Sequence, residues 1–169
     1  MEDSHMTTLT KEKIKANILP FALSIALALG VGLLSALITK DSMDIYSEIN
    51  VPPLSPPTWL FPVVWSVLYV LMGISAAIVY VKAADPEDLR KPMTYYLVSL
   101  ALNFVWSIVF FNGRTFFAAL CILLALLYFI VKTITEYFKI SKPAALLQLP
   151  YALWVAFAGY LNVGIWLIN

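Results

Sequence analysis

The feature that most constrains this chain is the spacing of its charged residues. Asp, Glu, Lys and Arg are absent from five long intervals: 16–39, 49–81, 92–113, 115–131 and 143–169. About 20 residues of helix cross a hydrocarbon core of about 30 Å, and a helix satisfies its own backbone hydrogen bonds there. The intervals therefore predict an all-α membrane protein, a bundle of five transmembrane helices near 16–38, 58–81, 93–112, 115–138 and 144–168.

Composition narrows the class of protein further. Apolar residues make up 62% of the 169 residues and charged residues 12%, which is too apolar for a soluble domain of this size. A net charge of +1 gives no basic surface for nucleic acid, so we expect the lipid bilayer as a partner and no nucleic acid. Because Cys121 is the only cysteine and His5 the only histidine, we also expect no internal disulfide, no metal site and no resident cofactor.

The five spans are expected to form a single domain over residues 16–169, preceded by a polar segment at 1–15. The first apolar run is longer than a signal peptide's and lacks a convincing cleavage site, so we expect it to remain in the mature protein. We expect residues 1–5 to be an added extension with Met6 as the natural start, and we leave them out of the functional argument.

Basic residues predict how the bundle is oriented. Nine of them lie in the N-terminal segment and in the two loops on the same side of the membrane, whereas the opposite side carries Lys40 and Arg114. Positive charge is concentrated in cytoplasmic loops. We therefore expect a multi-pass protein whose N-terminus is cytoplasmic and whose C-terminus lies on the opposite side.

The loop at 40–57 is longer than the other connections. Its end, Val51–Pro57, contains four prolines in six positions, and each proline restricts its own φ and the residue before it. Two interpretations remain open. The segment is either a stiff connector that begins the next helix or a rigid cover across the mouth of the bundle.

Aromatic side chains fall into two groups by depth. Trp65, Trp106 and Trp154 lie well inside their spans, where an indole N–H needs a partner that lipid does not offer, so we expect them to face the bundle interior. Seven others lie near predicted helix ends, where an interfacial aromatic belt explains them. These are Trp59, Tyr80, Tyr95, Tyr96, Tyr137, Tyr151 and Trp166.

Helical spacing adds neighbours to the three deep tryptophans. The resulting faces could line an apolar cavity that has a few hydrogen-bonding groups, as small-molecule sites do. They could equally interdigitate as a packed core, with Asn103 as an interhelical hydrogen-bonding residue. The faces comprise Trp65, Leu68, Tyr69 and Met72; Asn103, Trp106, Ser107 and Phe110; and Pro150, Trp154, Phe157, Ala158 and Leu161.

Small residues recur at four-residue spacing in two of the spans. Ala22, Ala26 and Gly30 form one such series, and Gly73 and Ala77 form another. Such residues permit close helix contact within one protomer or across a dimer. The interiors of the spans hold no histidine or carboxylate for a proton relay or a hydrolytic triad, so any ligand must bring most of the reactivity itself.

Three segments resemble the TspO/MBR family, which includes the tryptophan-rich sensory proteins and the translocator proteins (peripheral benzodiazepine receptors). They are Pro56–Gly73 (PPTWLFPVVWSVLYVLMG), Leu102–Phe111 (LNFVWSIVFF) and Leu149–Asn162 (LPYALWVAFAGYLN). The resemblance implies a receptor or sensor, commonly a homodimer, that binds porphyrins such as protoporphyrin IX under the first loop. Sterols and benzodiazepine-type ligands bind members of this family as well.

The resemblance also implies roles for individual residues. It places the two pocket tryptophans, implicated in porphyrin binding and light-dependent porphyrin breakdown, at Trp65 and Trp154. The pocket asparagine falls on Asn103 and the small pocket residue on Ala158, with Pro56 and Pro57 in the loop above. Any enzymatic activity would be slow photo-oxidative degradation of the porphyrin.

The sequence departs from the family in its loop, because Leu54 stands where a tryptophan is frequent, which leaves less stacking surface. Haem sites usually need an axial ligand such as histidine, so the scarcity of such residues favours a metal-free porphyrin whose propionates lie toward Lys40, Arg114 or loop amides. The alternative function is a transporter of small hydrophobic molecules. A purely structural membrane protein is the third class.

Overall fold

The computed structural model is built from helices. It describes the backbone of residues 2–42 and 45–169, and the side chains of residues 18–42, 45–46 and 48–169. The predicted polar segment at 1–15, with His5, lies outside the described side chains. Among the described residues, five helical segments are long and apolar enough to cross a membrane, which confirms the predicted five-helix architecture. These segments are Ile18–Ser42, Leu60–Lys82, Pro86–Asn112, Phe116–Ile140 and Lys142–Ile168.

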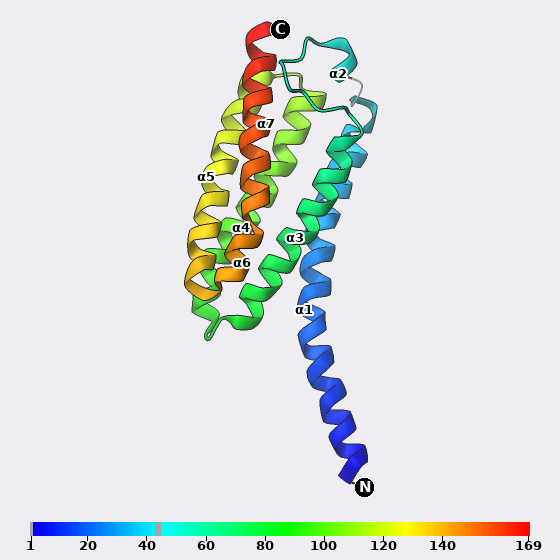
Figure 1. Cartoon of the computed structure of the whole chain (residues 1–169), viewed down its shortest axis with the longest axis vertical. Helices are drawn as coiled ribbons and strands as arrows, with labels where there is room; N and C mark the ends of the chain where they lie inside the picture. Colours follow the sequence, from blue (N-terminus) through cyan, green and yellow to red (C-terminus); the bar gives the residue numbers. More distant parts are fainter. Residues whose placement is uncertain (1, 43–44) are drawn as a thin grey trace.

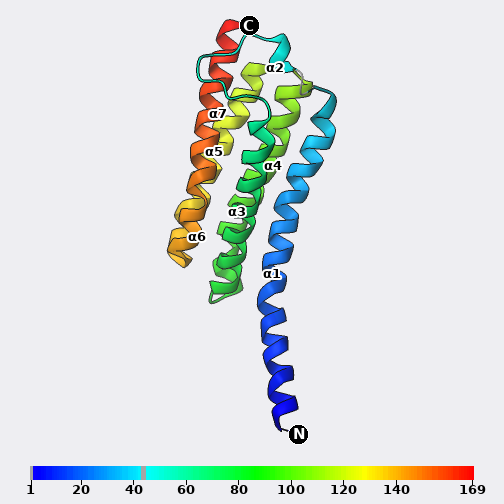
Figure 2. The same ribbon diagram turned by 45° about the vertical axis from the view of Figure 1, so that its right-hand side comes forward.

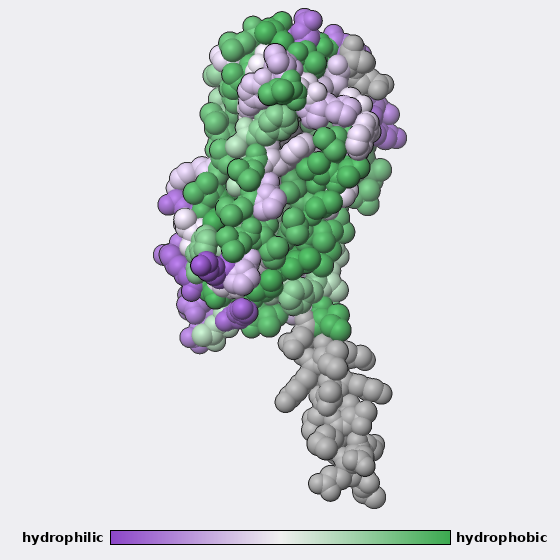
Figure 3. Space-filling view, viewed as in Figure 1, coloured by the Kyte–Doolittle hydropathy of each residue, from purple (hydrophilic) through white to green (hydrophobic). Residues whose placement is uncertain are grey.

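The elements run mostly antiparallel, so that consecutive long helices enter and leave the bundle at opposite ends (Figure 1). Helix α1 packs mainly against α3, α4 packs against α5, and α5 packs against α7. Apolar side chains cover the middle of the visible face, with polar side chains toward its two ends (Figure 3). The elements are α1 (Glu2–Thr39), the 3-10 turn η1 (Lys40–Ser42), α2 (Ile45–Glu48), α3 (Leu60–Lys82), α4 (Pro86–Ser107), the π-helical turn η2 (Ile108–Asn112), α5 (Phe116–Ile140), α6 (Lys142–Leu147) and α7 (Leu149–Ile168).

Two spans differ from the prediction at their ends. Helix α4 begins at Pro86, well before the predicted residue 93. Its first turn carries a proline and the acidic Glu87 and Asp88, all of which favour a helix N-terminus. A prediction from charge-free intervals leaves this charged turn out of the helix. The last span is divided at Gln148, because Pro150 has no N–H to continue the hydrogen-bond ladder.

The aromatic belt is only partly as predicted. Trp59, Tyr80 and Trp166 are exposed near helix ends, as an interfacial position requires. Three of the tyrosines assigned to the belt are instead almost fully buried, and that assignment is wrong for them: Tyr96, Tyr137 and Tyr151. They lie where neighbouring helices meet, and sequence position along a span does not reveal which way a residue faces.

The loop between α1 and α3 lies across one end of the bundle (Figures 1 and 2). Ile45 in its short helix α2 is fully buried, and Pro52 is buried against Gly164 of α7. Of the two interpretations of this loop, the structure therefore supports the one in which the loop covers the mouth of the bundle. The proline-rich end still serves as the lead into α3, since the carbonyl of Pro57 accepts a hydrogen bond from the Leu60 N–H at 3.0 Å.

Helices α1 and α3 approach each other closely at two glycines. A Cβ at Gly73 would lie 2.5 Å from the backbone Cα of Ile25 in α1, so that no other residue fits without separating the helices. Gly32 in α1 lies just as closely under the ring of Tyr69. By contrast, a Cβ at Gly30 would meet nothing within 4 Å. Of the small residues predicted to bring helices together, Gly73 does so here within one chain. The predicted series Ala22, Ala26 and Gly30 is exposed and makes no such contact within the chain.

Gly73→Ala should therefore destabilise the bundle, because its methyl group forces α1 away from α3. Overpacking of this kind costs about 1–3 kcal/mol, so we expect a lower midpoint of thermal unfolding in detergent. Gly30→Ala is the matched control and should leave the midpoint unchanged or slightly higher. Equal midpoints for the two variants would contradict the described α1–α3 contact.

Candidate functional site

A cavity of about 120 Å³ lies beneath the loop and is lined by residues of α1, α2, α3, α4 and η2. Four of the residues proposed from the sequence for a binding site line it together: Trp65, Tyr69, Trp106 and Ser107. Half of the remaining lining residues come from α1, and the three tryptophan faces included none of these eight residues. They are Gly32, Ser35, Ala36, Thr39, Tyr46, Phe61, Pro62 and Phe111.

Aromatic rings in mutual contact form the wall of this cavity. The Trp65 ring centroid lies 5.7 Å from that of Tyr69 and 6.3 Å from that of Trp106. Tyr46 from the loop lies 5.2 Å from Phe61 and 6.4 Å from Phe111. These are the distances of packed aromatic pairs, so the wall offers ring faces and edges to a ligand.

Two amides hold the aromatic wall in place from behind. Asn103 Nδ2 donates to the Tyr69 hydroxyl at 2.7 Å, and Trp106 Nε1 donates to Asn162 Oδ1 at 3.3 Å. Asn162 Nδ2 in turn donates to the carbonyl of Phe116 at 2.9 Å, which links α4, α5 and α7. Asn103 was proposed as a pocket residue and is fully buried in this position. The role of Asn162 was missed, although an amide within an apolar run was its signal.

The π-helical turn η2 brings further rings to the cavity. It follows directly after Ser107, and such turns change the direction in which successive side chains point. Phe110 is buried 5.5 Å from Trp106, and Phe111 lines the cavity next to Tyr46. Phe110, which was proposed as a site residue, therefore supports the wall from behind.

Trp154 lies on another surface. With Leu68 and Phe157 it lines a groove of about 540 Å³ between α3 and α7, outside the cavity. The ring of Phe61 connects the two places, since it lies 6.0 Å from Trp154 and also lines the cavity. The structure thus separates the two tryptophans that the resemblance places in one pocket.

The other proposed site residues lie around these two hollows and line neither of them. Ala158 is buried on α7. Pro56 is half-buried and Pro57 exposed in the loop segment that leads into α3. These prolines shape the cover, and neither touches the cavity.

Several contacts clamp the loop to the C-terminal part of α7, to the residue after it, and to the connection that precedes α5. The backbone N–H of Asn50 donates to Asn169 Oδ1 and the carbonyl of Asn50 accepts from Asn169 Nδ2, both at 2.9 Å. The Tyr160 hydroxyl donates to the carbonyl of Pro53 at 2.7 Å. Glu48 pairs with Arg114 at 2.7 Å. The cavity is thus closed on the loop side.

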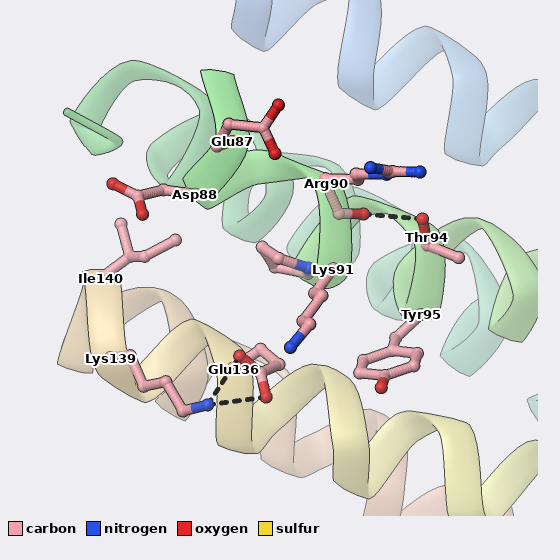
Figure 4. Close-up of a pocket in the computed structure, with 10 residues that line it drawn as sticks. Glu87, Asp88, Arg90, Lys91, Thr94, Tyr95, Glu136, Lys139 and Ile140 are labelled. Carbon is pink, nitrogen blue, oxygen red and sulfur yellow. Dashed lines mark hydrogen bonds and ion pairs between the residues drawn. The ribbon is translucent and has the colours of Figure 1, made fainter. Parts of the chain in front are cut away.

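A larger hollow of about 670 Å³ lies at the opposite end of the bundle, between the start of α4 and the end of α5 (Figure 4). Its walls carry three acidic and three basic side chains, and Lys139 pairs with Glu136 at 2.7 Å. Such a charged surface suits the water and lipid headgroups outside the membrane. Within the described residues, no group of three or more His, Cys, Asp or Glu side chains could hold a metal ion.

Comparison with known proteins identifies the family of this bundle. The model of the TspO/MBR family matches residues 24–167, which include the loop and most or all of each of the five spans. The chain belongs to the TspO/MBR family. The family's three aromatic segments therefore supply the wall of the cavity, its buried supports and the α3–α7 groove.

Individual relatives cover most of this TspO/MBR protein. Tryptophan-rich protein TspO of Chlorobaculum tepidum is 37% identical over 153 residues, 90% of this chain and 97% of the relative. Tryptophan-rich protein TspO of Archaeoglobus fulgidus is 37% identical over 154 residues, 90% and 99% of the two chains. The translocator protein of Bos taurus is 33% identical over 140 residues, 82% and 83% of the two chains.

The Tyr46 hydroxyl makes the cover sensitive to alkali. Burial raises the pKa of Tyr46 from 10.0 to about 12, because the charged phenolate is poorly solvated there. The folded state therefore retains its full contribution from Tyr46 below pH 10 and loses it as the pH rises toward 12. We expect the thermal midpoint to fall less steeply between pH 10 and 12 for Tyr46→Phe than for the parent chain. Tyr80→Phe, at an exposed tyrosine, is the control, and an identical slope for all three proteins would contradict this assignment.

Proposed function

We propose that this TspO/MBR protein is a membrane receptor or sensor for porphyrins of the protoporphyrin IX type and related hydrophobic ligands. The ligand binds against Trp65 in the bundle, under the loop that follows α1. The observation that carries the proposal is the aromatic wall, in which Trp65, Tyr69 and Trp106 line one apolar cavity. A flat, apolar macrocycle is the kind of ligand that such ring faces bind best.

The chemistry of the wall favours a ligand that needs no metal ligand from the protein. The described part of the cavity presents rings, hydroxyls and small apolar residues, and these bind by stacking and hydrogen bonding. Propionate groups would extend to the loop end of the bundle, where Lys40 and Arg114 lie. Arg114 already pairs with Glu48, so a propionate would compete for that guanidinium.

Light-dependent breakdown of the porphyrin is the second part of the proposal. The photoexcited macrocycle takes one electron from an indole and passes it to dioxygen, and the indole radical cation then takes one electron from the macrocycle. The macrocycle radical cation and superoxide combine to form a C–O bond at a bridging carbon. Cleavage of the O–O bond and of the adjacent ring C–C bond leaves two carbonyl groups, so that both oxygen atoms end in the product and the indole is restored. Trp65 is the donor in contact with the macrocycle. Trp154 lies behind Phe61 and serves as a more distant donor.

Titration of protoporphyrin IX into the purified protein tests this function, with tryptophan quenching and the porphyrin spectrum followed in darkness and under light. Trp65→Phe should weaken binding by about three- to tenfold, the value of a good aromatic contact. Trp166→Phe, at an exposed tryptophan outside the cavity, is the matched control and should bind as the parent does. Unsaturable binding, or equal affinity for all three proteins, would contradict the proposed site.

The illuminated samples test the photochemistry separately. Trp65→Phe should slow the light-dependent loss of the porphyrin spectrum at equal occupancy, and Trp154→Phe should slow it less. If both variants lose the spectrum at the rate of the parent, the tryptophans are not the electron donors.

Transport of small hydrophobic molecules is the second candidate, which the name of the bovine translocator protein favours. An assay in reconstituted vesicles distinguishes transport from binding alone. Movement of porphyrin across the bilayer faster than in empty vesicles would establish transport, whereas saturable binding without movement leaves the receptor. The homodimer and the cytoplasmic N-terminus remain predictions, which cross-linking in membranes and protease protection would check.

A further inference from the structure

We propose that the ligand reaches the cavity sideways from the bilayer, through a portal between α1 and α3. This inference rests on the proposed function and adds the route by which the same site is filled. The portal is the stretch of wall formed by Gly32 and Ala36 of α1 and by Pro62, Trp65 and Tyr69 of α3.

The first observation is that this stretch of wall borders two hollows. The same five residues line both the inner cavity and an outer groove of about 540 Å³ between α1 and α3. The groove continues along α1 over Ala26, Leu29, Gly30 and Leu33, all within the membrane-spanning part of the helix. Its lining is almost entirely apolar, so a hydrophobic ligand dissolved in the acyl chains can occupy it without losing hydration. Trp65 and the buried Tyr69 therefore border both the outer groove and the inner cavity.

The second observation is the small size of the inner cavity. At about 120 Å³ it is well below the roughly 300–1,000 Å³ of ordinary small-molecule sites. Part of its wall must move before a macrocycle fits. The wall that moves most easily also determines the direction from which the ligand arrives.

The third observation is that α1 is the most exposed of the five spans. Only 11% of the residues in its apolar window are buried, against 33–44% in the other four spans. Its side of the portal consists of small residues, so that moving α1 outward displaces backbone and methyl groups and no large side chain. The helix keeps its own backbone hydrogen bonds during such a movement, which is a requirement in lipid.

The loop is the competing route, and it is better secured. Two hydrogen bonds join Asn50 to Asn169, a third joins Tyr160 to Pro53, and Pro52 is wedged against Gly164. Opening this side would break those contacts and expose the buried Ile45. The geometry therefore favours lateral opening between α1 and α3 with the loop still closed.

Gly30→Phe tests the portal, because this ring would fill the outer groove while the inner cavity keeps its own residues. A side chain at residue 30 has open space around its Cβ, so the variant should fold. Ala22→Phe is the matched control, on the exposed surface of α1 but outside the groove. Both proteins and the parent are reconstituted in vesicles that contain protoporphyrin IX, and tryptophan quenching gives the rates of association and dissociation.

We expect Gly30→Phe to slow association and dissociation together by about tenfold, with the Kd within about twofold of the parent. An obstacle on the entry route slows both rates and leaves the bound state unchanged. Ala22→Phe should leave both rates unchanged. Equal rates in all three proteins, or a weaker Kd with faster dissociation in Gly30→Phe, would overturn the portal. So would unchanged rates accompanied by a change in oligomeric state, which would assign the groove to a second copy of the chain.

Tyr160→Phe provides a second measurement, because it removes one clamp of the loop. Lateral access predicts that its association rate equals that of the parent, whereas faster association would overturn the proposal in favour of the loop. If the parent itself shows no saturable binding, the proposed function fails and the portal fails with it. That result differs from saturable binding with rates that Gly30→Phe does not change, in which case only the portal fails.

Discussion

The close contact of α1 with α3 is the constraint on which the rest of the site depends. Lipid supplies no hydrophobic driving force between helices, so their association relies on close packing at small residues. Gly73 against Ile25 and Gly32 against Tyr69 supply that packing here. The same absence of side chains that lets the helices meet leaves space beside the meeting point. The cavity and the outer groove both lie there, with Trp65 between them.

The cover and the aromatic wall act as one unit above this contact. Tyr46 extends from the loop into the rings of Phe61 and Phe111, so the loop forms part of the cavity lining as well as its lid. The clamps at Asn169 and Tyr160 hold that ring in place from α7. A ligand that inserts beneath the loop must therefore either replace these aromatic contacts or enter beside them.

The five spans and part of the site could be predicted from the sequence for physical reasons. Charges are costly in hydrocarbon, so their spacing marks the spans, and the deep positions of Trp65 and Trp106 correctly indicated residues near the bundle interior. The direction in which a residue faces was less accessible. Trp154 shares the depth of Trp65 but lines a different groove, and Tyr151 is buried near a helix end, because both depend on how α7 is rotated against its neighbours. The contribution of Tyr46 could not be predicted, since it requires the path of the loop.

The most direct test of the proposed site is an experimental structure of the protein in membrane-like surroundings with protoporphyrin IX bound. We expect the macrocycle against Trp65 and Tyr69, beneath a loop still held by Asn50 and Asn169, with α1 displaced outward from α3. A macrocycle in the α3–α7 groove against Trp154, with the wall at Gly32 and Tyr69 unchanged, would contradict it.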